Sequence, residues 1–185
     1  MIIALVVIAV LVLLIGGYVF STYNRLVRLR VASEEGASEI DVQLKRRHDL
    51  IPNLVETVKG YAAHERGTLD EVIQARGAAM NAQGVQAQGQ AEGVLSQALG
   101  RLLAVAEAYP DLKANQNFQQ LQGELTATED RLAAARRFYN TTVKALNTAC
   151  QTIPSKWVAP LANVEAKEFF EVEDPSEKEV PEVKF

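Results

Sequence analysis

The side chains that could carry out acid–base or metal chemistry are few in this sequence. It has two histidines, His48 and His64, and each is followed directly by an acidic residue, Asp49 or Glu65. Adjacent residues on a helix point about 100° apart, so neither pair converges on a proton or a metal ion. The sequence also lacks a His-Glu-x-x-His motif, a paired-cysteine site and a phosphate-binding glycine loop. It therefore predicts no catalytic residue, no metal ligand and no cofactor.

The single cysteine and the charge balance bear on redox chemistry and nucleic-acid binding. Cys150 has no second cysteine with which to form an internal disulfide, and we interpret it as a small apolar filler within a helix. The chain carries 19 basic and 23 acidic residues, for a net charge of −4, and 6% of its residues are aromatic. Nucleic-acid-binding modules use a basic face and base-stacking aromatic residues, and neither is evident. We expect no nucleic acid among the partners.

A charged cluster at residues 41–49 is the remaining polar feature. Arg47 falls on the apolar stripe of its helix and should find an acidic or carbonyl partner if it is buried. The acidic candidates across a bundle are Glu124, Glu129 and Asp130. One interpretation is a salt-linked device that fixes the register of two helices. The alternative is a docking surface for a partner, formed by Gln43, Arg46 and Arg47.

The N-terminal stretch indicates how these residues are held in the cell. Residues 2–20 contain no charge, and Arg25, Arg28 and Arg30 follow them. At a rise of 1.5 Å per residue this stretch covers about 28 Å, close to the hydrocarbon thickness of a bilayer. No basic segment precedes it and no small-residue cleavage site is evident, so we expect an uncleaved anchor. The flanking arginines predict that the chain after the anchor is cytoplasmic, with the N-terminus outside.

Helical periodicity dominates the rest of the chain, which predicts an all-α fold. The anchor should continue into a helix over residues 24–61, with a kink or a break just before Pro52. Two shorter helices are expected over residues 68–82 and 91–108. Between them, residues 81–93 are rich in Gln, Gly and Ala, which predicts a weakly held connection or a loosely packed helix start.

The fourth helix has the strongest pattern outside the anchor. Large residues stand every seven positions: Phe118, Leu125, Leu132, Tyr139, Leu146 and Ile153. With Pro154 ending it, this helix and the first are about twice as long as the middle two. We therefore predict an antiparallel bundle of two long and two short helices. Four helices should pack together far from the membrane, and only the two long helices should pack together close to it. The expected domains are an anchor (1–22), a cytoplasmic helical bundle (23–155) and an irregular acidic tail (156–185).

The unequal helix lengths carry two expectations about surfaces. Two helices alone cannot bury a seam on all sides, so we expect an exposed apolar stripe formed by Leu132, Tyr139, Leu146 and Ile153. Self-association on the membrane is the first expectation for this seam, and a helix of another protein is the alternative. The end of the fourth helix should also bring Trp157 back to the lipid headgroups, although Trp157 could equally cap the base of the bundle.

The sequence resembles the LemA family in long blocks that occur in the same order. The blocks are YNRLV at 23–27, IDVQLKRRHDLIPNLVETVKGYAAHE at 40–65, EAYPDLKAN at 107–115, LQGEL at 121–125 and TEDRLAAARRFYN at 128–140. Phe118 and the terminal Val-Lys-Phe are similar as well, and the resemblance covers residues 1–153. It implies a bacterial inner-membrane protein with an N-terminal anchor, a long helical bundle and no known enzymatic activity.

The resemblance also indicates what such a protein would do. Related members are associated with a membrane metalloprotease, HtpX, or with magnetosome biogenesis. The expected function is a membrane-anchored, non-enzymatic scaffold that self-assembles on the inner membrane, with membrane lipid and further copies of the chain as partners. The alternative is an adaptor or regulator of a membrane protease such as HtpX. No catalytic residue of the family exists to transfer to this chain.

Overall fold

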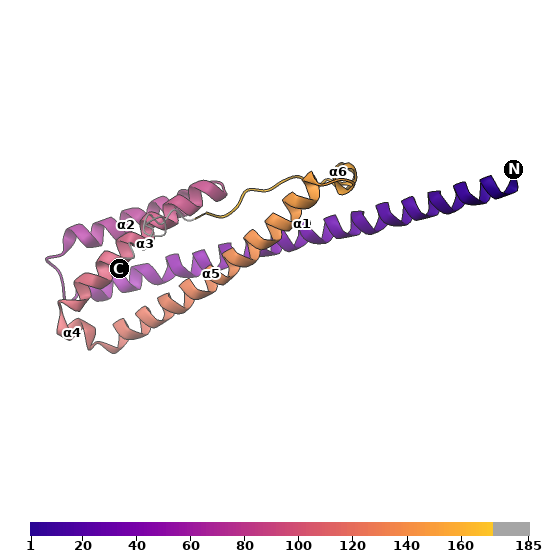
Figure 1. The fold of residues 1–185 in the computed structure, drawn as a ribbon. Helices are drawn as coiled ribbons and strands as arrows, with labels where there is room; N and C mark the ends of the chain where they lie inside the picture. The colour runs from indigo at the N-terminus through magenta and orange to yellow at the C-terminus, as the bar shows by residue number, and fades with distance from the viewer. Residues whose placement is uncertain (172–185) are drawn as a thin grey trace, which may run out of the picture. The chain divides into compact units, whose positions relative to one another are not determined.

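The computed structural model describes residues 1–171 of the 185-residue chain. Its helices are α1 (Ile2–Lys59), α2 (Arg66–Asn81), α3 (Val85–Glu107), α4 (Pro110–Lys113), α5 (Gln116–Gln151), α6 (Ser155–Val158) and the 3₁₀ helix η1 (Ala159–Ala162). No strand occurs among these described residues. The predicted all-α class, with two long and two shorter main helices, is confirmed (Figure 1).

Helix α1 continues without interruption from the apolar N-terminal stretch through Pro52 to Lys59 (Figure 1). The break expected before Pro52 is therefore absent. Proline lacks an N–H group, so the carbonyl of His48, four residues earlier, loses its helical donor. The side chain of Arg76 supplies a replacement, since its Nε donates to the His48 oxygen at 2.7 Å. A donor from α2 thus satisfies the group that the proline leaves unpaired.

The chain forms two compact units. The first consists of Met1–Ser38 and Ala135–Glu168, and the second consists of Glu39–Ala134 together with the described residues from Phe169 to Glu171.

The second unit packs four main helical segments around one core. Parts of α1 and α5 contribute to it, together with α2, α3 and the short α4, and α2 and α3 lie side by side (Figure 1). Its most completely buried apolar side chains include Ile51, Leu54, Val58, Val72, Leu95, Leu102 and Leu112. They follow the helical periodicity of the sequence, as burial of one face of each helix requires.

The connection between α2 and α3 is shorter and better packed than the sequence suggested. Only residues 82–84 lie outside the helices, with Gly84 at a φ of 88° that favours glycine. Gly89 is buried on α3, where a Cβ atom would collide with the carbonyl oxygen of Glu171. Glycine at position 89 therefore allows a close backbone approach, so this glycine reflects tight packing and not looseness.

In the first unit, α1 and α5 run antiparallel. Leu26 shares a buried cluster with Leu146, while Gly36, ten residues later, lies against Tyr139, seven residues earlier. A Cβ atom at Gly36 would come within 3.1 to 3.3 Å of side-chain and backbone atoms of Phe138 and Tyr139. Glycine at this position lets the two helices approach each other closely.

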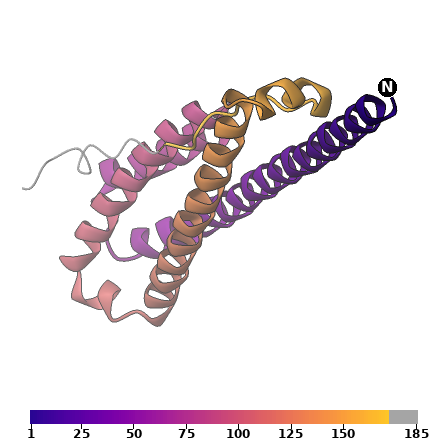
Figure 2. The same cartoon turned by 45° about the vertical axis from the view of Figure 1, so that its right-hand side comes forward.

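A C-terminal segment completes the first unit. After α6 and η1 the chain turns back along α5 (Figure 2), where Asn147 accepts from the backbone N–H of Lys167 at 2.9 Å and donates to its carbonyl at 2.8 Å. Val158 and Val164 join the cluster around Leu26 and Leu146. The segment that was expected to be an irregular acidic tail is thus helical at 155–162 and packed beyond it. Residues 172–185 of that predicted tail lie outside the described residues.

Candidate functional site

The most deeply buried polar cluster lies in the second unit and joins α1 to α3. Glu92 is only 1% exposed, and its carboxylate accepts from Arg47 Nη1 at 2.9 Å. Its other oxygen lies 2.7 Å from His48 Nε2. Because a carboxylate can only accept, the imidazole donates from Nε2. Arg47 and His48 are also buried, at 3% and 8% exposure. The Arg47 guanidinium therefore balances the buried Glu92 carboxylate, and His48 gives that carboxylate a second hydrogen bond.

Further contacts hold Arg47 in place. Its Nη2 donates to the hydroxyl of Ser96 at 2.7 Å, and its Nε lies 3.4 Å from a carboxylate oxygen of Glu129. Glu129 was among the partners expected from the sequence, whereas Glu92 was not. A signal for Glu92 existed, because it shares the helical stripe of Leu95 and Leu99, as Arg47 shares an apolar stripe on α1. Two opposite charges on facing apolar stripes are expected to pair.

This arrangement fits a register device better than the docking surface that was the alternative. Arg47 and Gln43 are buried, so neither is available to a partner in this structure. Only Arg46 is well exposed, and it donates to Glu124 at 3.0 Å. The predicted docking surface of Gln43, Arg46 and Arg47 is therefore wrong for two of its three members. Consecutive residues on a helix face different directions, which is why Arg46 and Arg47 differ in this way.

The chemistry open to this cluster is limited. Within the described part of the chain, no three His, Cys, Asp or Glu side chains are grouped so that they could hold a metal ion. Both oxygens of Glu92 and Nε2 of His48 are engaged with each other or with Arg47. His64 and Glu65, the other candidate pair, lie at the turn before α2, where Glu65 accepts from the hydroxyl of Tyr109. The hydrogen bonds of this cluster join α1 to α3 and thereby fix how the two helices pack.

The seam on α5 is covered by the chain itself, contrary to expectation. Leu132, Tyr139 and Leu146 are buried, and Ile153 alone remains exposed, at 69%. The hydroxyl of Tyr139 donates to the carbonyl oxygen of Glu168 at 2.9 Å. Burial, and secondly the negative charge of the Glu168 carboxylate, raise the pKa of this phenol. The returning segment therefore occupies the position where a second copy was expected.

The residues expected to flank the membrane lie in the first unit. Arg30 donates through Nη1 to the carbonyl of Ala162 at 3.3 Å, and its Nε lies 3.9 Å from Glu34. Arg25 and Arg28 are exposed. Trp157 is 68% exposed, so it does not serve as a buried cap of the bundle. It lines a groove together with Leu14, Ile15 and Tyr18 of the apolar segment of α1.

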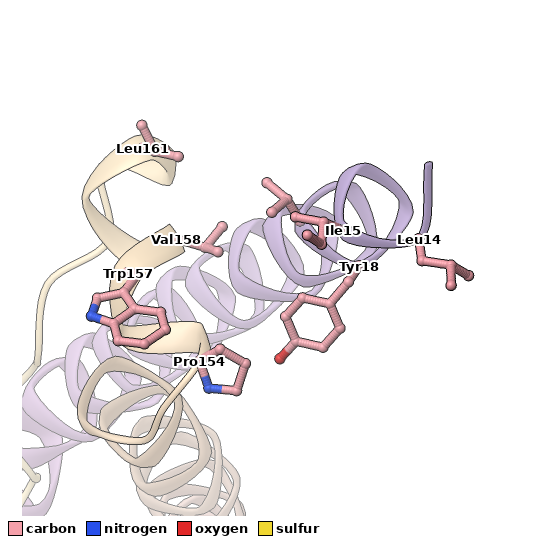
Figure 3. Close-up of a pocket in the computed structure, with 8 residues that line it drawn as sticks. Leu14, Ile15, Tyr18, Pro154, Trp157, Val158 and Leu161 are labelled. Atoms are coloured by element: carbon pink, nitrogen blue, oxygen red, sulfur yellow. The ribbon is translucent and has the colours of Figure 1, made fainter. Parts of the chain in front are cut away.

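An apolar groove separates α1 from the turn that contains α6 and η1. Its volume is about 480 Å³. Leu14, Ile15 and Tyr18 form one wall, and Pro154, Trp157 and Leu161 belong to the other side (Figure 3). Figure 3 shows Tyr18 and Pro154 facing each other across it. Its volume falls within the range of small-molecule sites, and its lining is almost wholly apolar.

A polar pocket of about 320 Å³ lies between α1 and α5 in the same unit. Arg25 and Lys144 line it together with four residues that carry hydroxyl groups: Thr141, Thr148, Thr152 and Ser155. Pro154 lines the apolar groove and its neighbour Ser155 lines the polar pocket, so the two are adjacent along the chain. Sequence reasoning missed both, because each is formed by residues more than a hundred positions apart.

Comparison with known proteins identifies the family of the chain. The LemA family profile matches residues 36–185, most of the chain. The chain belongs to the LemA family. The predicted family is thereby confirmed, and the matched region contains the whole of the second unit.

Several similar proteins are named as magnetosome proteins. Magnetosome protein MamQ of Magnetospirillum gryphiswaldense is 25% identical, with 80% of this chain and 64% of the relative aligned. Magnetosome protein MamQ 2 of Paramagnetospirillum magneticum is 26% identical, again with 80% of this chain and 64% of the relative aligned. Protein LemA of Metamycoplasma hominis is 28% identical, covering 74% of this chain and 63% of that protein. The chain thus spans less than two thirds of the length of these relatives.

Membrane association follows from the helix itself. Among the described residues, α1 is the one helix long and apolar enough to span a bilayer, and none of that apolar window is buried. Every residue from Met1 to Tyr18 is exposed. A continuous apolar surface of this size is not left in water by a folded protein. Together with the LemA and MamQ relatives, this indicates a membrane-associated helical protein.

Proposed function

We propose that the chain is a non-enzymatic scaffold, anchored in the bacterial inner membrane by residues 2–20, which self-assembles there with its bundle in the cytoplasm. The observation that carries the proposal is the continuity of α1. The same helix supplies the exposed apolar segment and, from Ile51 to Val58, part of the core of the second unit. No loop separates anchor from bundle, as is expected of a protein that presents a folded surface at the membrane.

The charge arrangement supports the proposed orientation. Arg25, Arg28 and Arg30 follow the apolar segment, and basic residues on that flank favour a cytoplasmic location. A reporter enzyme that is active only in the cytoplasm should be active when it is fused after Phe185. Activity of a periplasmic reporter at the same position would contradict the orientation.

Self-assembly needs a surface other than the predicted seam, since Leu132, Tyr139 and Leu146 are buried. The anchor offers one, because every residue from Met1 to Tyr18 is exposed and none of its apolar window is buried. The full-length protein in mild detergent or nanodiscs at micromolar concentration should have the mass of a multimer. A chain lacking residues 1–22 is the matched control and should be a monomer. A monomeric full-length protein would overturn self-assembly and leave the adaptor role.

One observation favours the adaptor of a membrane protease as the second candidate. Ile73 and Met80, seven residues apart on α2, are both more than half exposed. Gly77 lies between them, and the space beside it is open. An apolar stripe with a small central residue is a surface on which a partner helix can pack.

Cross-linking can test this candidate. In a Cys150→Ala background, a cysteine at Gly77 should cross-link to a co-expressed membrane protease of the HtpX kind. A cysteine at Gln74, about 60° away around the same helix, is the control and should react less. Equal yields at both positions, or none at either, would argue against an adaptor surface on α2.

A further inference from the structure

The charges of the first unit are segregated by sign in a way that the net charge conceals. No aspartate or glutamate occurs from Met1 to Ser33, and none occurs from Arg131 to Val164. The basic residues in these two stretches are Arg25, Arg28, Arg30, Arg131, Arg136, Arg137, Lys144 and Lys156. Antiparallel packing of α1 and α5 brings most of both stretches into one unit. That unit therefore presents positive charge next to a segment long enough to cross a bilayer.

The apolar groove and the polar pocket are aligned on α1. Tyr18 lines the groove and Arg25 lines the pocket. Seven residues separate them, which places them nearly on one face of the helix and about 10 Å apart along its axis. Leu14, one turn before Tyr18, continues the same stripe on the apolar side. A single elongated ligand lying along this face would meet apolar walls first and cationic and hydroxyl groups next.

The polar pocket is suited to an anion. Its lining contains two cationic side chains and several hydroxyl groups, but no carboxylate. Within the described residues, neither Arg25 nor Lys144 forms an ion pair. Both side chains are exposed, so their charges are free to act on a ligand. The hydroxyls of Thr152 and Ser155 donate to backbone carbonyl groups, so Thr141 and Thr148 are the hydroxyl donors that remain beside the two cations. Arginine and lysine flanked by hydroxyl donors form a common environment for a phosphate group.

We propose that the groove and the pocket together bind one anionic phospholipid of the membrane. Its acyl chain lies in the groove between Tyr18 and Trp157, and its phosphate lies beside Arg25 and Lys144. The source of the ligand is the bilayer, because Leu14, Ile15 and Tyr18 form a wall of the groove and belong to the membrane-spanning segment or its edge. The inference rests on anchoring of α1 and does not require self-assembly or a protease partner.

Trp157 makes the proposal directly measurable, because it is the only tryptophan of the chain and it lines the groove. The full-length protein is reconstituted in phosphatidylcholine vesicles that contain a small fraction of brominated phosphatidylglycerol or of brominated phosphatidylcholine. Bromine on the acyl chain quenches the indole on contact. We expect phosphatidylglycerol to occupy the groove about fivefold more favourably than phosphatidylcholine, as one cation near the lipid surface provides.

Two double variants, each of which removes two positive charges, distinguish binding at the pocket from attraction of anionic lipid by the surface charge in general. The double variant R25Q/K144Q should lose the preference for phosphatidylglycerol while brominated phosphatidylcholine quenches as before. The control R28Q/K156Q removes two exposed basic residues that do not line the pocket, and should keep the preference. Circular dichroism should show equal helix content in both.

Any of four outcomes would overturn the proposal. The first is no preference in the unaltered protein, and the second is a preference that survives R25Q/K144Q. The third is an equal loss in both double variants, since a surface potential alone would then explain it. Millimolar inorganic phosphate should leave the preference unchanged; if phosphate abolished it, the pocket would be a site for the free anion. Oligomeric mass does not enter the measurement, so its failure and that of the scaffold are distinguishable.

Discussion

Glu92, Arg47 and His48 form a cluster in which each side chain is stable only because of the others. An isolated carboxylate in an apolar core would be strongly disfavoured, and here it accepts from two donors on the neighbouring helix. Replacing a fully buried ion pair by apolar residues is often tolerated, whereas removing one partner is not. The cluster therefore specifies the pairing of α1 with α3 more than it adds to stability.

Glu92→Ala should lower the free energy of unfolding by about 3–5 kcal/mol, because it leaves the Arg47 guanidinium buried without its main partner. The measurement is denaturant unfolding followed by far-ultraviolet circular dichroism. Glu124→Ala is the matched control, since it removes the partner of the exposed Arg46 and should cost less than about 1 kcal/mol. Similar losses for the two variants would show that burial does not set the cost.

Cys150 should react slowly with alkylating agents. Burial among the residues around Leu146 raises the pKa of its thiol, and the thiolate is the reactive form. At pH 7.5 the rate with N-ethylmaleimide should therefore be lower in the folded protein than in the same protein in guanidinium chloride. Raising the pH above the ordinary thiol pKa should increase the folded-state rate. A rate equal to that of the unfolded chain at pH 7.5 would refute this interpretation.

At the scale of the elements, helix α1 tolerates an internal proline because another helix compensates for it. The Arg76 side chain donates to the carbonyl that Pro52 leaves without a helical donor. If this is the reason why α1 continues, the two residues are energetically coupled. Coupling of this kind is measured by a double-mutant cycle.

Arg76→Met should cost about 1–3 kcal/mol in the presence of Pro52, since the buried carbonyl of His48 would lose its partner. In a Pro52→Ala background the new N–H can take that role, so the same change should cost less. Unfolding midpoints of the four proteins give the coupling energy. Arg101→Met, which removes the ion pair with Glu71 on the exposed surface, should show no coupling to Pro52→Ala. Equal costs of Arg76→Met in both backgrounds would contradict the compensation.

The sequence predicted the helices but not what covers them. Heptad spacing identified α5 and its large residues because those residues face the interior with a helical period. The cover of Tyr139 and Leu146 comes from residues 155–168, a stretch of short helix and extended chain that has no periodicity to read. Arg47 was recognisable as buried from its place on an apolar stripe, and Glu92 was overlooked because its segment resembled a linker.

At the scale of the whole molecule, the net charge of −4 averages over regions of opposite character. The acid-free stretches, residues 1–33 and 131–164, belong largely to the first unit. Composition alone suggested no basic face, because the two stretches are far apart in sequence and only the antiparallel pairing of α1 with α5 joins them. A membrane surface rich in anionic lipid is the environment that such a region favours.

The anchor should be separable from the folded part of the chain. Residues 1–18 are entirely exposed, and the large core around Leu54 and Leu102 contains no residue before Ile51. A chain that begins at Val19 should therefore retain the unfolding midpoint of the full-length protein, while it loses its sedimentation with vesicles. Its helical signal should fall in proportion to the residues removed from α1.

The same truncation tests whether the groove beside Trp157 depends on the anchor. With Leu14, Ile15 and Tyr18 removed, one wall of the groove is gone, and the indole should become more exposed to water. Its emission should shift to longer wavelength relative to the full-length protein in nanodiscs, while the circular dichroism of the remaining helices persists. If the truncated chain instead lost its cooperative unfolding, the apolar segment would be part of the fold itself, and an anchor that merely holds the protein at the membrane would be the wrong description of residues 1–22.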